Sequence, residues 1–165
     1  MYTGYAAFNG PFVIRYPRGK GEMKDWRNEM QVLPIGKGKK LRDGDDIAVL
    51  SIGPIGNEVI KAIEMVKEEG VSIAHYDMIY LKPLDEELLH EIGRKYNRII
   101  TVENGVIKGG FGSAVLEFMA DNGYTPHVKR IGVPDAFIEH GSIPELYQLC
   151  GMDAESIAKQ LKKEN

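Results

Sequence analysis

The stretch RIITVENGVIKGGFGSAVLEFM, residues 98–119, decides the fold. Its apolar run at residues 99–102 predicts a buried strand, and the apolar positions after Gly112 predict a helix. Gly109, Gly110 and Gly112 allow positive φ angles and close backbone contacts, and the first free N–H groups of the helix point out of the turn. The turn either holds an anion or serves only as a tight corner. The corner is favoured, because a lone glycine cluster is a weak signal.

Length and composition are those of one main globular domain. The chain has 165 residues, of which 43% are hydrophobic and 27% charged, and a net charge of −3. Its longest apolar runs are of strand length, and no basic stretch followed by an apolar core opens the sequence, so neither secretion nor membrane insertion is indicated. We therefore expect a cytoplasmic protein. The single cysteine, Cys150, lies at helical spacing and is interpreted as a packing residue.

Positive charge is concentrated near the N-terminus. Residues 15–42 carry nine Lys and Arg against three acidic residues, whereas the remainder of the chain is acidic. A basic segment of this kind is suited to binding an anionic small molecule or nucleic acid. However, the single Trp26 and the scattered spacing of the basic residues provide no stacking platform for bases. We expect no nucleic-acid partner and no membrane partner.

Strand and helix patterns alternate from residue 46 onward. Gly70 is the expected end of the first helix, Asp85 and Asp153 are expected N-caps, and Ser142 is expected to begin a short helix. Right-handed crossovers between such elements favour a mostly parallel sheet with helices on both faces. The predicted strands are residues 46–52, 71–76, 99–102 and 127–132, with a short extension at 79–81.

The first forty residues depart from this alternation. Residues 1–8 have the pattern of the tail of a helix, residues 11–16 that of a strand, and residues 19–40 that of a Gly-rich, charged connection. We expect the chain to begin inside an earlier domain. An unpaired apolar strand at 11–16 invites pairing with a second copy or with the edge of the main domain.

Several further motifs have a functional and a purely structural interpretation. Residues 53–56, GPIG, followed by Asp77, imitate a dinucleotide fingerprint but lack its third glycine, so a turn is expected. Glu103 lies where ligands gather in parallel sheets, yet a carboxylate there can equally bind loop N–H groups, and both possibilities stay open. For Asp135 and Glu139, loop bracing and helix capping are favoured over a site.

No metal or hydrolase site is predicted. The four histidines are dispersed, without Cys or carboxylates at metal-ligand spacing, and no Ser-His-Asp order, nucleophile elbow or P-loop can be assembled. They are His75, His90, His127 and His140.

Six motifs together resemble the C-terminal region of the 1-deoxy-D-xylulose-5-phosphate synthases, a family of transketolase-type enzymes that use thiamine diphosphate. Any one motif is modest support, but all six occur in the family's order and spacing, and the resemblance covers essentially the whole chain. The motifs are RYPRG at 15–19, LPIGKG at 33–38, KPLD at 82–85, TVE at 101–103, GGFGSAV at 109–115 and FIEHGS at 137–142.

The resemblance implies an α/β fold and a domain plan. The fold class is three-layer α/β/α with a mostly parallel, mixed five-stranded sheet, like the transketolase C-terminal domain. Residues 1–20 are similar to the tail of the family's pyrimidine-binding domain, residues 21–40 to a linker, and residues 41–165 to the C-terminal domain.

The resemblance also implies a function for the complete protein. In this family the thiazolium ylid attacks pyruvate, carbon dioxide leaves, and the enamine adds to glyceraldehyde 3-phosphate to give 1-deoxyxylulose 5-phosphate, a precursor of isoprenoids, thiamine and pyridoxal. Thiamine diphosphate and Mg²⁺ are bound by upstream domains, so no catalytic, cofactor or metal residue is expected here, and the fragment alone is expected to be inactive. The C-terminal domain supports a homodimer.

One site residue carries over from the family. Arg15, the first arginine of RYPRG, matches a residue that binds the phosphate of the aldehyde substrate, and Arg18 is the reserve candidate. The planar guanidinium fork suits a phosphate dianion better than lysine does. The structural alternative is that these arginines pair with surface carboxylates.

Two other functions compete with this assignment. One is the C-terminal part of a keto-acid dehydrogenase E1 β subunit or a transketolase, against which the RYPRG and EHGS segments argue. The other is a free-standing flavodoxin-like module that binds an anion at the Gly110 turn.

Overall fold

The computed structural model describes residues 1–17 and 27–162. The chain divides into two units, Met1–Ile35 and Gly36–Asn165. In chain order the elements are α1 Tyr2–Ala7, β1 Lys39–Arg42, β2 Ile47–Ile52, α2 Gly56–Met65, the 3-10 helix η1 Lys67–Glu69, β3 Ile73–Asp77, α3 Glu86–Lys95, β4 Arg98–Val106, α4 Phe111–Asp121, β5 His127–Val133, α5 Ile143–Leu149 and α6 Ala154–Leu161.

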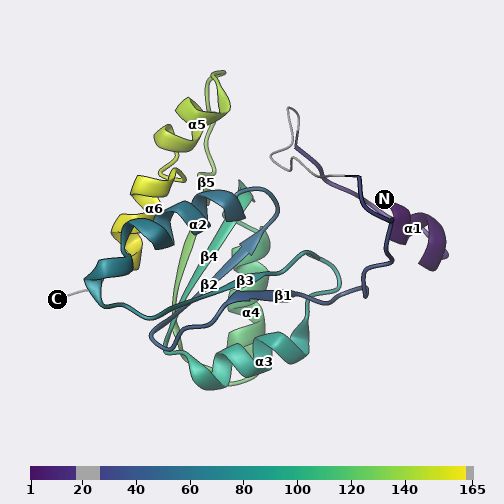
Figure 1. Ribbon diagram of the computed structural model, residues 1–165, viewed down its shortest axis with the longest axis horizontal. Coiled ribbons are helices and arrows are strands. Elements are labelled where there is room, and N and C mark those ends of the chain that lie inside the picture. Colours follow the sequence, from purple (N-terminus) through teal and green to yellow (C-terminus); the bar gives the residue numbers. More distant parts are fainter. Residues whose placement is uncertain (18–26, 163–165) are drawn as a thin grey trace. The chain divides into compact units, whose positions relative to one another are not determined.

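A five-stranded sheet forms the centre of the second unit, with strand order β1-β3-β2-β4-β5. Strand β2 pairs in parallel with β3 and β4, and β4 pairs in parallel with β5, whereas β1 runs antiparallel to β3. Helices lie on both faces (Figure 1). The predicted three-layer fold with a mixed, mostly parallel five-stranded sheet is confirmed.

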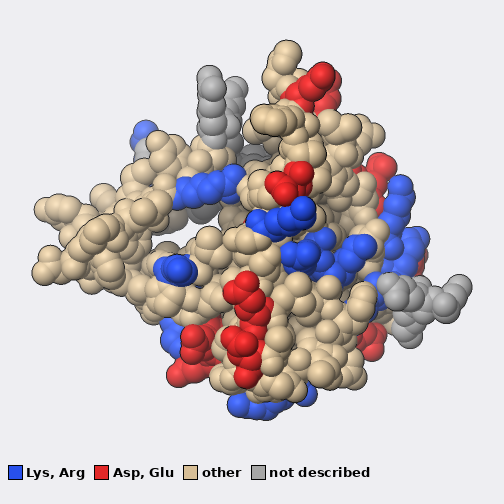
Figure 2. All heavy atoms as spheres, turned by 180° about the vertical axis from the view of Figure 1, so that it is seen from behind, with Lys and Arg blue, Asp and Glu red and all other residues tan. Residues whose placement is uncertain are grey.

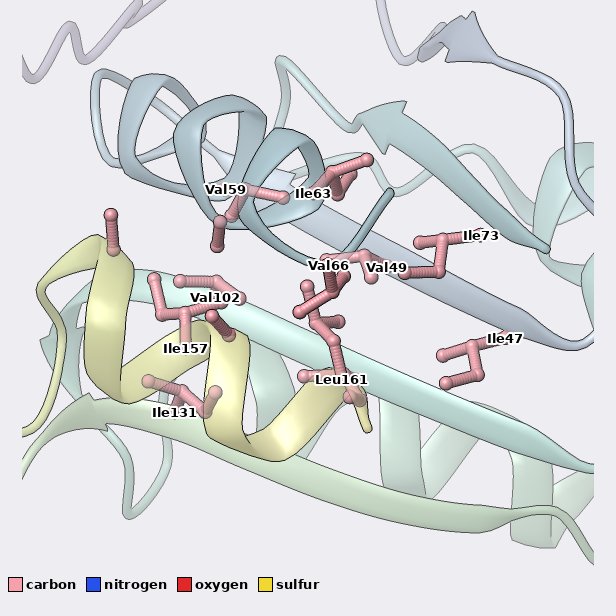
Figure 3. Close-up of a cluster of buried hydrophobic side chains, with 14 of the residues drawn as sticks. Ile47, Val49, Val59, Ile63, Val66, Ile73, Val102, Ile131, Ile157 and Leu161 are labelled. Carbon is pink, nitrogen blue, oxygen red and sulfur yellow. The ribbon is translucent and has the colours of Figure 1, made fainter. Parts of the chain in front are cut away.

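Helices α2 and α6 cover one face of the sheet. Their apolar positions pack against alternate residues of the strands, with β-branched side chains filling most of the layer (Figure 3). Burial of this layer supplies the hydrophobic driving force for folding on this side. Its labelled members are Ile47, Val49, Val59, Ile63, Val66, Ile73, Val102, Ile131, Ile157 and Leu161.

Helices α3 and α4 cover the opposite face. Here the larger side chains Tyr76, Phe111 and Met119 are buried together with strand residues such as Leu50 and Ile99. The central strand β2 therefore contributes side chains to both layers, which explains why its sequence is a continuous apolar run.

The predicted helix ends are confirmed by their hydrogen bonds. The Asp85 carboxylate accepts from the Leu88 N–H at 3.2 Å, and the Asp153 carboxylate accepts from the Ser156 N–H at 3.0 Å. Ser142 and Glu145 form a capping box at the start of α5, in which the Ser142 N–H donates to Glu145 at 2.9 Å. The predicted end at Gly70 differs in detail, because α2 itself ends at Met65 and Gly70, with φ 73°, ends the 3-10 helix η1 that follows it.

Strand β1 was not predicted, because its first two residues fall inside the expected connection at 19–40. Its sequence, KKLR, is exposed on both faces, so it carries neither the alternation nor the apolar run that signals a strand. In the sheet it pairs with β3, at the edge. Charged residues of this kind are common on edge strands, where they discourage pairing with other chains.

The strand extension predicted at residues 79–81 is wrong. Ile79 has φ 55°, a left-handed conformation that a strand cannot contain. The Asp77 carboxylate accepts a hydrogen bond from the Ile79 N–H at 3.1 Å and turns the chain away from the sheet.

The first unit contains the predicted helix but not the predicted strand. Helix α1 is held by the Thr3 hydroxyl, which accepts from the Leu33 N–H at 3.0 Å. Residues 11–16 are irregular, and the rings of Phe8 and Phe12 meet edge to face at 5.5 Å. Since a strand exists only with a hydrogen-bonded partner, an apolar sequence was not sufficient here. Pairing of this segment with another chain stays a prediction.

Candidate functional site

The corner between β4 and α4 is closed by a carboxylate of the chain itself. Glu103, near the carboxyl end of β4, is only 5% exposed. Its two oxygens accept from the N–H groups of Phe111 and Gly112, at 2.8 Å each. These are first-turn N–H groups of α4, which have no partner within the helix. The negative charge also lies at the positive end of the helix dipole.

Glycine is required at two positions of this corner because neighbouring groups leave no room for side chains, the Glu103 carboxylate at Gly110 and the Thr101 and Arg130 side chains at Gly112. A Cβ on Gly110 would overlap the Glu103 carboxylate and the Val106 carbonyl oxygen. A Cβ on Gly112 would come within 2.5 Å of the Thr101 hydroxyl oxygen. Of the two interpretations left open for Glu103, the structure supports the binding of N–H groups of the chain itself. The carboxylate therefore occupies the place that an external anion would take at the turn, in agreement with the favoured interpretation of the glycines as a tight corner.

Arg130 braces the loop that carries these glycines. From β5 its guanidinium Nη1 donates to the Ile107 carbonyl and to the Ser113 hydroxyl, both at 2.8 Å. The Ser113 hydroxyl also accepts from the Gly109 N–H at 3.0 Å. No sequence pattern singles out Arg130, because nothing local to β5 links it to a loop that lies about twenty residues earlier.

We expect Glu103→Ala to destabilise the second unit by about 2–4 kcal/mol, because two buried N–H groups lose their acceptor. Glu103→Gln keeps one acceptor oxygen and should cost less. Urea denaturation followed by circular dichroism measures both free energies of unfolding. Equal stability of Glu103→Ala and the unsubstituted chain would contradict the assigned role.

A second buried polar pair joins β2 to β3. The Ser51 hydroxyl and His75 Nε2 lie 2.8 Å apart, and His75 is 1% exposed. Burial lowers the pKa of His75 from 6.5 to about 4, which keeps the ring neutral at ordinary pH. Gly56, the first residue of α2, leaves the space that Ser51 occupies, since a Cβ there would lie 2.9 Å from the hydroxyl.

His75 should make the stability of the fold depend on pH. Its pKa is about 4 when folded and about 6.5 when unfolded, so the unfolded chain takes up the proton first as the pH falls. Stability is therefore fully present above about pH 6.5 and falls by about 3 kcal/mol on the way to pH 4. The difference between the unfolding free energies of the unsubstituted chain and His75→Gln, measured from pH 4 to 8, isolates this contribution. A difference that is independent of pH would refute it.

The remaining motifs have structural roles. Gly53, with φ 80°, makes the turn into α2, as the GPIG interpretation predicted. Asp135 is exposed and pairs with Lys108 at 3.1 Å, which braces two neighbouring loops. Glu139 is exposed, and the capping role near it belongs to Glu145. Cys150 is partly buried against the α2–α6 layer.

The histidines lie apart from one another. His90 on α3 is 3.0 Å from the Tyr124 hydroxyl, while His127 and His140 are exposed. Within residues 1–17 and 27–162, no three His, Cys, Asp or Glu side chains gather closely enough to hold a metal ion. In the same ranges, no helix combines the length and apolar character needed to cross a membrane.

Arg15, the predicted phosphate-binding residue, is exposed in the first unit. Arg18, the reserve candidate, lies outside the described residues. The Glu103 corner belongs to the second unit.

Surface charge is mixed on the face shown in Figure 2, where lysines and arginines lie among acidic residues. Ion pairs of the second unit include Arg42 with Glu64 at 3.1 Å and Lys95 with Asp45 at 2.8 Å. Such pairs contribute little to stability in water, about 0–1 kcal/mol each.

The structure defines a class of protein, the three-layer α/β domain. Among the residues that the structure describes, the polar groups of the sheet mainly bind other groups of the same domain, and the Glu103 carboxylate closes the corner between β4 and α4. Residues 36–157 match the family model "Transketolase, C-terminal domain". This chain belongs to that family.

Curated relatives are 1-deoxy-D-xylulose-5-phosphate synthases. The protein of Parabacteroides distasonis is 98% identical over 165 residues, which cover 100% of this chain and 26% of that protein. The protein of Bacteroides thetaiotaomicron is 61% identical over 165 residues, covering 99% of this chain and 26% of that protein. The chain therefore spans about a quarter of the length of these relatives and matches their C-terminal region.

Solved structures give the same fold. A protein described as "Split gene transketolase, inactive beta4 tetramer" superposes with a TM-score of 0.71 and 31% identity, covering 81% of this chain and 45% of that one. The transketolase of Campylobacter jejuni gives a TM-score of 0.57 at 13% identity, covering 76% of this chain and 18% of that one, which supports the fold alone.

Proposed function

We propose that this chain is the C-terminal part of a thiamine-diphosphate-dependent 1-deoxy-D-xylulose-5-phosphate synthase, a transferase that works in the cytoplasm as a homodimer. The observation that carries the proposal is the 98% identity to such a synthase over the whole chain. The complete enzyme converts pyruvate and glyceraldehyde 3-phosphate into 1-deoxyxylulose 5-phosphate and carbon dioxide, which supplies isoprenoid, thiamine and pyridoxal synthesis.

The described residues do not fit magnesium and thiamine diphosphate. The first-turn N–H groups of α4, the best candidates for binding a diphosphate, are already bound by Glu103. Within the described ranges there is also no carboxylate or histidine cluster suited to Mg²⁺. We therefore assign the cofactor and its metal to the part of the synthase that this chain lacks.

The role of the present chain is structural. Its buried polar groups, Glu103, Ser51 and His75, bind partners inside the fold rather than facing a cleft. A domain of this kind supports the catalytic domains and the dimer. Residues 1–20 are then the tail of the pyrimidine-binding domain and residues 21–40 a linker. The family match from residue 36 and the unit that begins at Gly36 favour a C-terminal domain that starts a few residues before 41.

The 165-residue chain alone should form no 1-deoxyxylulose 5-phosphate from the two substrates with thiamine diphosphate and Mg²⁺, because residues 1–17 and 27–162 offer no site that fits the cofactor and its metal. The complete synthase should form the product under the same conditions. Calorimetric titration of the short chain with thiamine diphosphate and with flavin mononucleotide should show no binding of either. Tight flavin binding would favour a flavodoxin-like module instead.

In the complete synthase, Arg15→Ala should raise the KM for glyceraldehyde 3-phosphate roughly 10- to 100-fold, since a charge-assisted contact to phosphate contributes about 1.5–3 kcal/mol. The KM for pyruvate, which has no phosphate, should change little. Arg18→Ala tests the reserve candidate, and Arg94→Ala, at an exposed position on α3, is the matched control. Equal effects of Arg15→Ala on both substrates would end the assignment.

A further inference from the structure

The chain contains three Asn-Gly pairs, a dipeptide that carries a chemistry of its own. They are Asn9-Gly10, Asn104-Gly105 and Asn122-Gly123. In such a pair the backbone nitrogen of the glycine can attack the side-chain amide carbon of the asparagine, because glycine has no side chain to obstruct the approach and lets the backbone rotate. In sequence the three pairs are alike, whereas the structure gives each a different environment.

Reaction within a pair has a conformational requirement. The glycine nitrogen has to reach the asparagine side chain, so its N–H must be free and the backbone must rotate. A pair that is held by hydrogen bonds has to open first, and this local opening costs the free energy of those bonds. Hydrogen bonding and burial therefore rank the three pairs.

The pair Asn104-Gly105 is held inside strand β4 and is partly buried. The Asn104 side-chain N–H donates to the Tyr147 hydroxyl at 3.1 Å. The preceding residue, Glu103, is bound to the start of α4 through both carboxylate oxygens. Rotation of this backbone would disrupt the strand and its connection to the helix, so the pair is protected.

The pair Asn122-Gly123 is exposed at the end of helix α4, but both of its reacting groups are engaged. The Asn122 side-chain N–H donates to the Phe118 carbonyl at 2.9 Å. The Gly123 N–H, which contains the attacking nitrogen, donates to the Ala120 carbonyl at 3.1 Å. Two hydrogen bonds have to open before these groups can meet.

The pair Asn9-Gly10 has neither form of protection. It follows helix α1 in the irregular segment at residues 8–17, and both of its residues are exposed (Figure 1). Within the ranges that the structure describes, no hydrogen bond involves the Asn9 side chain or the Gly10 N–H. The fold therefore leaves this pair ready to react.

We propose that Asn9 is a site of spontaneous deamidation, favoured by the fold over Asn104 and Asn122. The Gly10 nitrogen forms a bond to the side-chain carbon of Asn9, and the amide nitrogen leaves as ammonia with the proton of the Gly10 N–H. The product is a succinimide ring, which water opens at either carbonyl to leave aspartate or isoaspartate. Residues 1–17 contain no Asp or Glu, so the reaction places an acidic side chain in the segment that carries Arg15.

Peptide mapping by mass spectrometry tests the proposal on the folded 165-residue chain. Incubation at mildly alkaline pH in water enriched in heavy oxygen marks the conversions that occur before sample preparation. We expect Asn9 to react at least about tenfold faster than Asn122, because each of the two hydrogen bonds that protect Asn122 lowers the reactive population roughly fivefold. Asn104 should be as slow as Asn122 or slower.

Unfolding supplies the control for local sequence. In urea the three pairs lose their hydrogen bonds, and their rates should become similar. If Asn9 kept its full lead in urea, the neighbouring residues would set the order instead of the fold, and the proposal would be rejected. It would equally be rejected if Asn104 or Asn122 reacted as fast as Asn9 in the folded chain, or if Asn9 stayed intact.

Two variants identify the reacting groups. Deamidation makes the net charge of −3 more negative by one unit, which ion-exchange chromatography resolves, and Asn9→Gln should abolish this acidic species because its longer side chain closes a ring less readily. Gly10→Ala should slow the loss of Asn9 several-fold, since a methyl group obstructs the attacking nitrogen. Gly123→Ala is the matched control and should leave the rate at Asn9 unchanged. An acidic species that persists in Asn9→Gln, or an unaltered rate in Gly10→Ala, would overturn the assignment.

Discussion

The carboxylate of Glu103 is the constraint on which the corner between strand and helix depends. Glu103 lies on β4, the strand between β2 and β5, and its carboxylate accepts hydrogen bonds from two N–H groups of α4. The helix can then start directly above the sheet and bury Phe111 in the core. Because the Glu103 carboxylate occupies this position, Gly110 has to be free of a side chain, while Gly112 leaves room for Thr101 and Arg130. Arg130 also holds the loop from β5. One buried carboxylate thus ties strand β4 to the start of helix α4.

The same principle recurs in the other buried polar groups of the sheet. Ser51 and His75 bind each other across β2 and β3, and Asp85 caps α3 while also accepting from the Gly38 N–H at 2.9 Å. Each group is used to hold elements of the fold together. Large apolar side chains that stay exposed include Phe137, Ile143 and Leu149. The internal use of these polar groups agrees with the structural role proposed for the domain.

Elements with a strong local signal were predictable, and those defined only by a neighbour were not. The apolar run of β2 and the N-caps Asp85 and Asp153 can be predicted from a few neighbouring residues of sequence. Strand β1 has no such signal, since its four exposed residues become a strand only by pairing with β3. The converse holds at residues 11–16, where an apolar sequence has no strand partner within the described part of its unit.

The sequence by itself determined the class of the fold, the glycine corner at residues 109–112 and the six motifs that carry the family resemblance, because these depend on residue type and spacing along the chain. Only the tertiary structure decided what the corner binds. Glu103 and Gly112 are nine residues apart in sequence, and a carboxylate in that position can reach an N–H group or a ligand equally well. Whether the carboxylate binds an N–H group or a ligand depends on the distances between these atoms. The packing of α4 on the sheet sets those distances.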